Sequence, residues 1–553
     1  MLVDFEANQL ENFDIVAELD HEVTTKALLN PLILHKVFCS LDVPTLKSVR
    51  LVCTLWADVG ATYLGKKGRF TLSAESDLTS FLPSLDTDLA KNVHLLFRRC
   101  VCYDICKCPP DLTNLLSNFV LLLPQISDQL ETLRFFHVNA FEPLQEIWSS
   151  YDFRNLTQIL IKVNGLCLDK RAPPPPTMAK FRALPNLKVF HVEMWPEVRN
   201  SLLMTVVTTI FQNLVNSAPN LEDFYLDAMF YLDLTPCGKL KTFRHNYFSM
   251  AGFQLQIPEM TKMLASCRNS VENLTLENAG WSDDPMELNF RFPNLTHLKL
   301  KAGYVYNIND SLNVTNLPKL THFSITSIDT SSECDIAMML ENYNSRHVGI
   351  TSLHVGCSHN PEIGNNWDGP AGDLLVNMFL AVTELKLCML MEFYSDFDQY
   401  FLPLGETLRS FGNWELTRGQ VEFDMTFASP KSINYPDQEF GSLLIIAVLR
   451  GMMGWRGLAT TSLQFTGHRC NYAEFRLLDE MRDALLSCSM IGSVVIAGFL
   501  MDEPTKDNFR TFIRQHNLPI TNEVLKAYGI KSIERKKKEM QDKTKVAGLK
   551  AIA

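Results

Sequence analysis

The sequence predicts an α/β protein in which a small all-helical module precedes a long repeat solenoid, with a parallel sheet on the concave face and helices or loops on the convex face. The chain has 553 residues, too many for one compact core. It is 46% apolar and 20% charged, which is the balance of a chain that folds. A short apolar pattern also returns at intervals from Leu156 onward. Stacked repeats account for both the length and the recurrence.

The helical module is expected over residues 26–66. Leu34, Phe38 and Leu41 recur at the three- and four-residue spacing of an amphipathic helix, and Pro31 sits where a helix can begin. Apolar positions of one or two further short helices follow at Leu46, Val49, Val52, Cys53 and Trp56. Because so small a segment cannot bury all these side chains by itself, we expect it to dock on a partner surface. The alternative is the first helical hairpin of an all-helical domain.

The order of these residues resembles the F-box motif across its whole length. It departs from the motif at Asn30, where Leu is common, and at Leu32, where an acidic residue is common. The resemblance implies docking on a Skp-type adaptor, which joins the chain to a cullin scaffold carrying a RING subunit. We expect Trp56 and Leu34 to be the main anchors of a contact in which helices place apolar side chains in a groove. The adaptor-binding residues that the resemblance implies are Pro31, Ile33, Leu34, Val37, Phe38, Leu41, Leu46, Val52 and Trp56.

The recurring pattern is an apolar residue, two variable ones, another apolar residue, one variable residue and a third apolar residue, which is typical of the strand of a leucine-rich repeat. Pro-Asn-Leu or Pro-Lys-Leu introduces several copies. Complete copies begin at Leu187, Leu221, Val271, Leu295 and Leu320, and further copies begin at Leu156, Leu240, Ile350 and Val382. The later copies, Leu408-x-x-Phe411, Ser462–Phe465 and Ile491-x-x-Val494-x-Ile496, are weaker.

Between the strands we expect crossovers of varying length. Residues 201–217 fit a helix on the convex face. Pro173–Pro176 predicts a stiff extended stretch in a longer loop, with a proline-motif ligand as the less favoured alternative. The expected organisation is an N-terminal extension at 1–25, the F-box at 26–66, the leucine-rich-repeat solenoid at 67–520 and a charged tail at 521–553.

Residues that alternate with the apolar strand positions face the concave surface, where they are free to contact a partner. Their charges are mixed, which suits a protein segment with its own charge pattern. Polar residues occupy such positions in any soluble repeat, so the set carries more weight than any member. The candidate substrate-binding residues are His191, Tyr225, Arg244, Lys299, His322, His354 and Lys386.

Composition argues against several classes of partner and location. A formal charge of −11 does not support nucleic-acid binding, although residues 531–553 hold eight Lys or Arg against three Asp or Glu. The acidic N-terminus lacks the pattern of an export signal, and the apolar run Leu443–Leu449 is too short to cross a membrane. We therefore expect a cytoplasmic or nuclear protein with reduced cysteines and no membrane contact. Its Asn-x-Thr sequences are then part of the repeat pattern and not glycosylation sites.

No pattern points to catalysis, and we expect no catalytic residue, cofactor or metal. The chain lacks a glycine-rich phosphate loop, a His-Glu-x-x-His helix and a Gly-x-Ser-x-Gly elbow. Four thiols between Cys100 and Cys108 could hold zinc by number, but their spacing is unlike that of paired Cys-x-x-Cys knuckles. The tail sequence Glu534–Glu539 favours a solvated helix end over a nuclear import signal.

The F-box joined to these repeats resembles the leucine-rich-repeat class of F-box proteins. That resemblance implies a non-catalytic subunit of a cullin-RING ubiquitin ligase, which binds the adaptor through the F-box and a protein target through the repeats. One alternative is a repeat scaffold that binds a partner without ubiquitination. Another is an enzyme with an unrecognised site, which would need a pocket of perturbed titratable groups.

Overall fold

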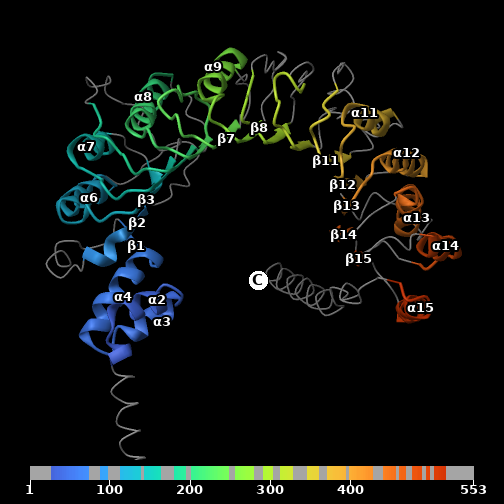
Figure 1. Cartoon of the computed structure of the whole chain (residues 1–553), viewed down its shortest axis with the longest axis horizontal. Helices are drawn as coiled ribbons and strands as arrows, with labels where there is room; N and C mark the ends of the chain where they lie inside the picture. The colour runs from blue at the N-terminus through green and yellow to red at the C-terminus, as the bar shows by residue number, and fades with distance from the viewer. Residues whose placement is uncertain are drawn as a thin grey trace, which may run out of the picture. The chain divides into compact units, whose positions relative to one another are not determined.

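The computed structural model forms two compact units, Met1–Leu240 and Lys241–Ala553. The residues that it describes are 26–73, 87–96, 112–138, 142–163, 180–194, 201–247, 256–278, 291–302, 312–327, 346–359, 370–393, 398–427, 440–455, 460–468, 476–487, 493–497 and 503–518. Figure 1 shows an α/β architecture in which parallel strands follow one another along the chain, with helices between many of them. None of the described helices is long and apolar enough to cross a membrane.

The first unit begins with the helices α2 (Pro31–Phe38), α3 (Val43–Val49) and α4 (Thr54–Lys67). Each of the first two helices has a side-chain cap: the Oδ1 atoms of Asn30 and Asp42 accept hydrogen bonds from the backbone N–H groups of Leu32 and Thr45, both at 2.9 Å. Asn30 thus supplies a helix cap that an apolar side chain at this position could not provide. The buried centre of the helices is made by Leu34, Phe38, Leu46 and Val59.

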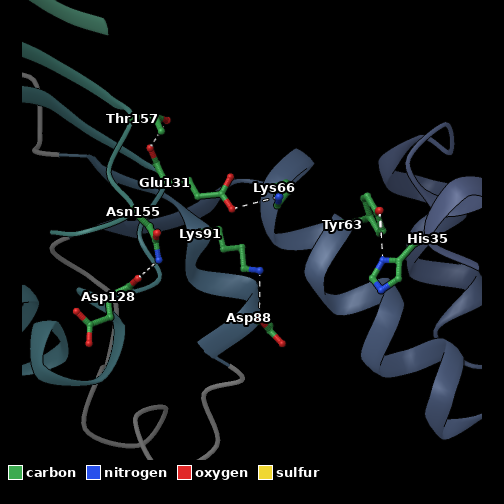
Figure 2. Close-up of polar contacts among 9 residues, drawn as sticks. All are labelled: His35, Tyr63, Lys66, Asp88, Lys91, Asp128, Glu131, Asn155 and Thr157. Carbon is green, nitrogen blue, oxygen red and sulfur yellow. Dashed lines mark hydrogen bonds and ion pairs between the residues drawn. The ribbon is translucent and has the colours of Figure 1, made fainter. Parts of the chain in front are cut away.

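Helix α4 packs closely against the first repeat, which contains β1 (Phe70–Ser73), the 3-10 helix η2 (Thr87–Lys91) and β2 (Asn92–Leu96). A Cβ atom on Gly65 would lie 1.9 Å from the carbonyl oxygen of Asp88, so only glycine permits this approach. Lys66 Nζ also lies 3.4 Å from Glu131 Oε1, which joins α4 to the residue before the third strand (Figure 2). The helical module is therefore packed onto the repeats and not merely tethered to them.

The strands of the first unit are parallel and follow chain order, each paired with the next. Helices α6, α7 and α8 cover one face of this sheet (Figure 1), and we call the opposite face the open face. The remaining elements of the unit are α6 (Leu112–Ile126), β3 (Thr132–Val138), α7 (Glu142–Ser150), β4 (Gln158–Val163), β5 (Val189–Met194), α8 (Ser201–Ser217) and β6 (Asp223–Asp227).

Strand β3 contains the one register irregularity among the described strand pairs of this unit, between Phe135 and Val138. His137, inside the irregularity, has a φ of 62°, which is uncommon for a residue with a side chain. A bulge of this kind bends the strand and changes the direction of the side chains around it.

The second unit continues the same architecture, and its described strands are again parallel and in chain order. Its elements are β7 (Thr242–Tyr247), α9 (Ile257–Cys267), β8 (Asn273–Asn278), β9 (His297–Ala302), β10 (His322–Ser327), β11 (Ser352–His359), α11 (Pro370–Met378), β12 (Glu384–Phe393), α12 (Asp398–Ser410), η4 (Phe411–Asn413), β13 (Arg418–Phe427), α13 (Phe440–Met452), β14 (Thr460–His468), α14 (Asp479–Ser487), β15 (Ser493–Ala497) and α15 (Glu503–Gln515).

Side chains of the Asn-x-Thr sequences tie each of two repeats to the one before it. Asn155 donates to the carbonyl of Asp128 at 2.5 Å, and Thr157 donates to the carbonyl of Glu131 at 2.9 Å (Figure 2). In a later repeat, Asn294 and Thr296 make the same two kinds of bond at 2.8 and 3.1 Å. These bonds satisfy backbone carbonyls at the turns and give the Asn-x-Thr pattern a structural role.

The structure confirms the strands predicted from Leu156 to Val382, which coincide with β4 to β12, and the helix predicted over residues 201–217. The copy predicted at Leu408-x-x-Phe411 is wrong, because these residues lie in α12 and η4. Both side chains are buried, and a spacing of three residues satisfies a helix face as well as the repeat pattern. Residues 1–25, Cys100–Cys108, Pro173–Pro176 and the tail from 521 lie outside the described residues.

Candidate functional site

Helix α2 is apolar on two sides, and only one of them is covered by the described residues. Leu34 and Phe38, four residues apart, are 2% and 1% exposed and pack against α3 and α4. Leu32, Ile33 and Val37 point elsewhere and are exposed, Leu32 to 79%. Apolar side chains that gather on the exposed side of a helix are typical of a contact surface, so the second side of α2 lacks the cover that its composition calls for.

More exposed aliphatic residues lie before α2 and in the turn between α3 and α4. Leu51 and Val52, between α3 and α4, are 87% and 61% exposed. The indole Nε1 of Trp56 donates to the carbonyl of Leu28 at 2.8 Å, which holds the chain before α2 against the start of α4. We call the following residues the exposed aliphatic set: Leu28, Leu29, Leu32, Ile33, Val37, Leu51 and Val52.

The residues predicted to bind an adaptor therefore divide into two groups. Pro31, Ile33, Val37 and Val52 are exposed and are available to a partner. Leu34, Phe38 and Leu46 form the centre of the module, and Leu41 and Trp56 are half-buried against it. Four members of the exposed aliphatic set, Leu28, Leu29, Leu32 and Leu51, were not predicted. Their signal in the sequence is that they fall off the buried stripe yet are still apolar.

In the second unit we likewise call the face of the sheet opposite its helices the open face (Figure 1). Four predicted substrate-binding residues share one row there. Register pairing places Arg244, Lys299, His354 and Lys386 on the same line across β7 to β12. His322 lies in the neighbouring row, beside His297. We call the first line the central row, and its members are Arg244, Thr275, Lys299, Ser324, His354, Lys386 and Gln420.

His354 is the most enclosed titratable group of the central row. Its Nδ1 atom lies 3.1 Å from Ser324 Oγ, and its buried Nε2 atom has no hydrogen-bond partner among the described residues. Burial lowers the pKa of His354, and the charges of Lys386 and Lys299 lower it further, while Glu422 opposes them. The imidazole is therefore neutral at physiological pH.

Cross-strand ion pairs give the open face its mixed charge. Lys301 pairs with Glu277 at 3.5 Å, and Lys386 pairs with Glu422 at 3.4 Å. Burial alone would raise the pKa of Glu422, but hydrogen bonds from Cys388, Lys386 and Gln420 lower it on balance, so the carboxylate is ionised. Exposed pairs of this kind contribute little to stability and more to the recognition of charge.

Two histidines stack beside the central row. The rings of His297 and His322 are 4.1 Å apart at 14°, and each Nδ1 lies 2.9 Å from the hydroxyl of the threonine before it. Burial lowers the pKa of His297, and the neighbouring His322 adds to the effect. The pair is a flat polar surface on which a partner side chain could rest.

The two predicted residues of the first unit also meet on its open face. His191 and Tyr225 are register partners on β5 and β6, and their rings are 5.7 Å apart, edge to face. Arg134 and His94 lie in the same row nearer the N-terminus. Neither was predicted, because the predicted copies begin at Leu156, beyond both of their strands.

One thiol lies on the outward side of β12, beside a carboxylate of β13. Cys388 donates to Glu422 Oε2 at 3.1 Å, and burial together with this carboxylate raises the pKa of its thiol to about 12, so the thiolate nucleophile is scarce. Within the described parts of the chain, no group of three or more His, Cys, Asp or Glu side chains is placed to hold a metal ion.

Comparison with models of known protein families and with curated proteins finds no match for this chain.

Proposed function

We propose that the chain is a non-catalytic substrate receptor of a cullin-RING ubiquitin ligase. In this proposal the helical module α2–α4 is an F-box that docks on a Skp-type adaptor, and the open face of the repeats holds a target protein. Ubiquitin transfer belongs to other subunits, and this chain contributes proximity, which lowers the barrier without a catalytic side chain of its own.

The observation that carries the proposal is the exposed aliphatic set on so small a module. Contiguous apolar side chains on a soluble protein mark a contact with a partner. The order of buried and exposed residues supports the F-box interpretation, because Leu34, Phe38 and Leu46 hold the helices together and leave Ile33, Val37 and Val52 for the adaptor. Leu34 then acts by supporting α2 and not as an anchor.

The open face supports target binding by its chemistry. The central row combines cations, hydroxyls and an amide at regular strand spacing. The row on the side away from His322 adds the carboxylates of Glu277 and Glu422. An extended protein segment with alternating charges would find complementary groups along it. Close packing of α4 against Asp88, through Gly65, places the module at a defined position beside the first repeat.

The test is co-purification of the full chain with a Skp-type adaptor, beside the double variant Leu51→Ser and Val52→Ser. Both side chains are exposed, so their loss leaves the core of the module intact. We expect adaptor affinity to fall at least tenfold, because each aliphatic side chain buried in a contact contributes about 1.5–3 kcal/mol. Leu34→Ala is unsuitable, since it would empty a site in the core.

The matched control is Leu121→Ser with Leu380→Ser, which removes two aliphatic side chains that are 61% and 50% exposed elsewhere on the chain. This control should bind the adaptor as the unchanged chain does. If the folded, unchanged chain does not bind the adaptor, the ligase proposal fails and a repeat scaffold without ubiquitination takes its place.

A further inference from the structure

The open face of β1–β3 carries cationic side chains without a counter-ion among the described residues. Arg69 immediately precedes β1, and Arg134 lies on β3. None of the ion pairs within the described part of the chain involves either arginine. Two described carboxylates before β3 and on β5 have other partners: Glu131 pairs with Lys66, and Glu193 pairs with Lys162.

His94 lies between the two arginines and is only 5% exposed. It is the register partner of Arg134 on one side and of Thr71 on the other. Neighbouring strands lie ~5 Å apart, so the strands that carry the arginines are ~10 Å apart, a distance that two long side chains can close above His94. Thr71 and Arg134 are on the same face as His94, because residues paired in register share a face of the sheet, and Arg69 lies two residues before Thr71, just outside the strand.

Asn92 fixes the arrangement of this site. Its Nδ2 donates to the carbonyl of Gly68 at 2.9 Å, which sets the orientation of the amide and leaves Oδ1 to accept from His94 Nε2 at 3.1 Å. The residue before Arg69 is thereby tied to the histidine. The ring nitrogen Nε2 therefore carries the proton, and because the pKa of His94 is lowered to about 4 the ring is neutral at physiological pH and supplies no charge to the site.

Arg134 is the second observation that points to a ligand. Its Nε atom is buried and has no hydrogen-bond partner among the residues that the structure describes, although an N–H donor in such a place is nearly always paired. Burial lowers the pKa of Arg134, and the positive charge of Arg69 lowers it further. Burial and both arginines also lower the pKa of His94 to about 4.

We propose that Arg69 and Arg134, on either side of His94 at the open face of β1–β3, form a binding site for a doubly charged phosphate group. Two guanidinium groups balance a dianion, whereas one carboxylate would leave a positive charge unmatched. Guanidinium groups donate pairs of parallel N–H bonds to phosphate oxygens, and Arg69, which is exposed, can offer such a pair. The bulge at His137 turns β3 beside the site, as bulges next to binding sites do.

The site rests on the proposed role of the open face in binding and is independent of adaptor docking. A phosphate group could arrive free in solution or on a phosphorylated side chain of a target. Titration calorimetry of the full chain separates these sources, with inorganic phosphate as one probe and a short peptide carrying one phosphoserine, beside its unphosphorylated twin, as the other. Whichever phosphate probe binds more tightly identifies the source.

We expect Arg69→Gln and Arg134→Gln each to weaken phosphate binding at least tenfold, while Arg154→Gln, which changes an exposed arginine of the same unit, leaves it unchanged. Arg69 is exposed, so its variant remains decisive if Arg134→Gln does not fold. Bound phosphate should also raise the pKa of His94, measured by NMR of its ring, because the anion offsets the two positive charges. Absence of phosphate binding, binding that both variants retain, or acetate binding as tight as phosphate binding would overturn the assignment.

Discussion

At the scale of the residue, two histidines at equivalent strand positions show how neighbouring side chains change the pKa of an imidazole. His94 and His354 both lie on the open face of a sheet, each beside basic residues. Burial is the main cause of the lowered pKa of both, and adjacent cations add to it. Alternation along a strand predicted that His354 faces outward, but its degree of enclosure depends on side chains from strands far away in the sequence, which no local pattern contains.

His94 makes the stability of the chain depend on pH. Its pKa is about 4 in the folded chain against 6.5 for an ordinary histidine, so the unfolded chain binds the proton more readily. The stabilisation is therefore fully present above pH 6.5 and is lost as the pH falls toward 4. At about 1.4 kcal/mol for each tenfold change in proton affinity, the loss is at most about 3.5 kcal/mol.

The measurement is urea denaturation of the unchanged chain and of His94→Gln at several pH values in this range. Gln keeps a donor for Asn92 but does not titrate, so the variant should lose less stability on acidification. Identical pH dependence in the two proteins would show that His94 does not have the lowered pKa.

At the scale of the element, the strands were predictable where the repeat pattern is complete. Leu295, Leu298 and Leu300 are all buried, as the pattern requires, and they position β9. The same pattern begins at Leu130 and would have predicted β3. Strand β13 gives no such signal, because Gly419 occupies the second apolar position of its copy. The close approach of α4 to η2 could not be predicted, because glycine inside a helix usually indicates low helix stability and not close packing.

Gly65 provides the test of that approach. Gly→Ala inside a helix normally raises stability by up to about 1 kcal/mol. At Gly65 the new methyl group would lie 1.9 Å from the carbonyl oxygen of Asp88, so we expect Gly65→Ala to lower the free energy of unfolding, by about 1–3 kcal/mol. Urea denaturation measures the change.

The control is Gly238→Ala, because a Cβ atom there meets nothing within 4 Å. Its effect should be neutral or slightly stabilising. A stabilised Gly65→Ala protein would mean that α4 and η2 do not approach so closely in solution.

At the scale of the whole molecule, the stacking of repeats assembles the candidate binding surfaces. Each repeat contributes a few outward side chains, and only register pairing between many strands assembles them into the central row or the arginine site. Local patterns predicted Arg244, Lys299, His354 and Lys386 as separate candidates, and the parallel register places them in line. The ion pairs that set the charge pattern of the open face, such as Lys386 with Glu422, join residues from different repeats. They could not be derived from the spacing of residues along the sequence.

Stacking also predicts that damage to one repeat is local. Phe323 on β10 is 1% exposed, and its ring lies 5.6 Å from that of Phe379, which follows α11. Phe323→Ala leaves a cavity that costs about 3–5 kcal/mol. Because each repeat contacts mainly its neighbours, this loss should fall on β9–β11 and spare β13 and β14.

Hydrogen exchange resolved by segment tests this directly. Amides of β9–β11 should exchange faster in Phe323→Ala, while those of β13 and β14 keep their protection. Val348→Ala, which trims a side chain that is 57% exposed, should change neither group. Equal loss of protection across β9–β14 would mean that the second unit unfolds as one cooperative body, and the open face would then act as a single rigid surface in target binding and not as a series of separable repeats.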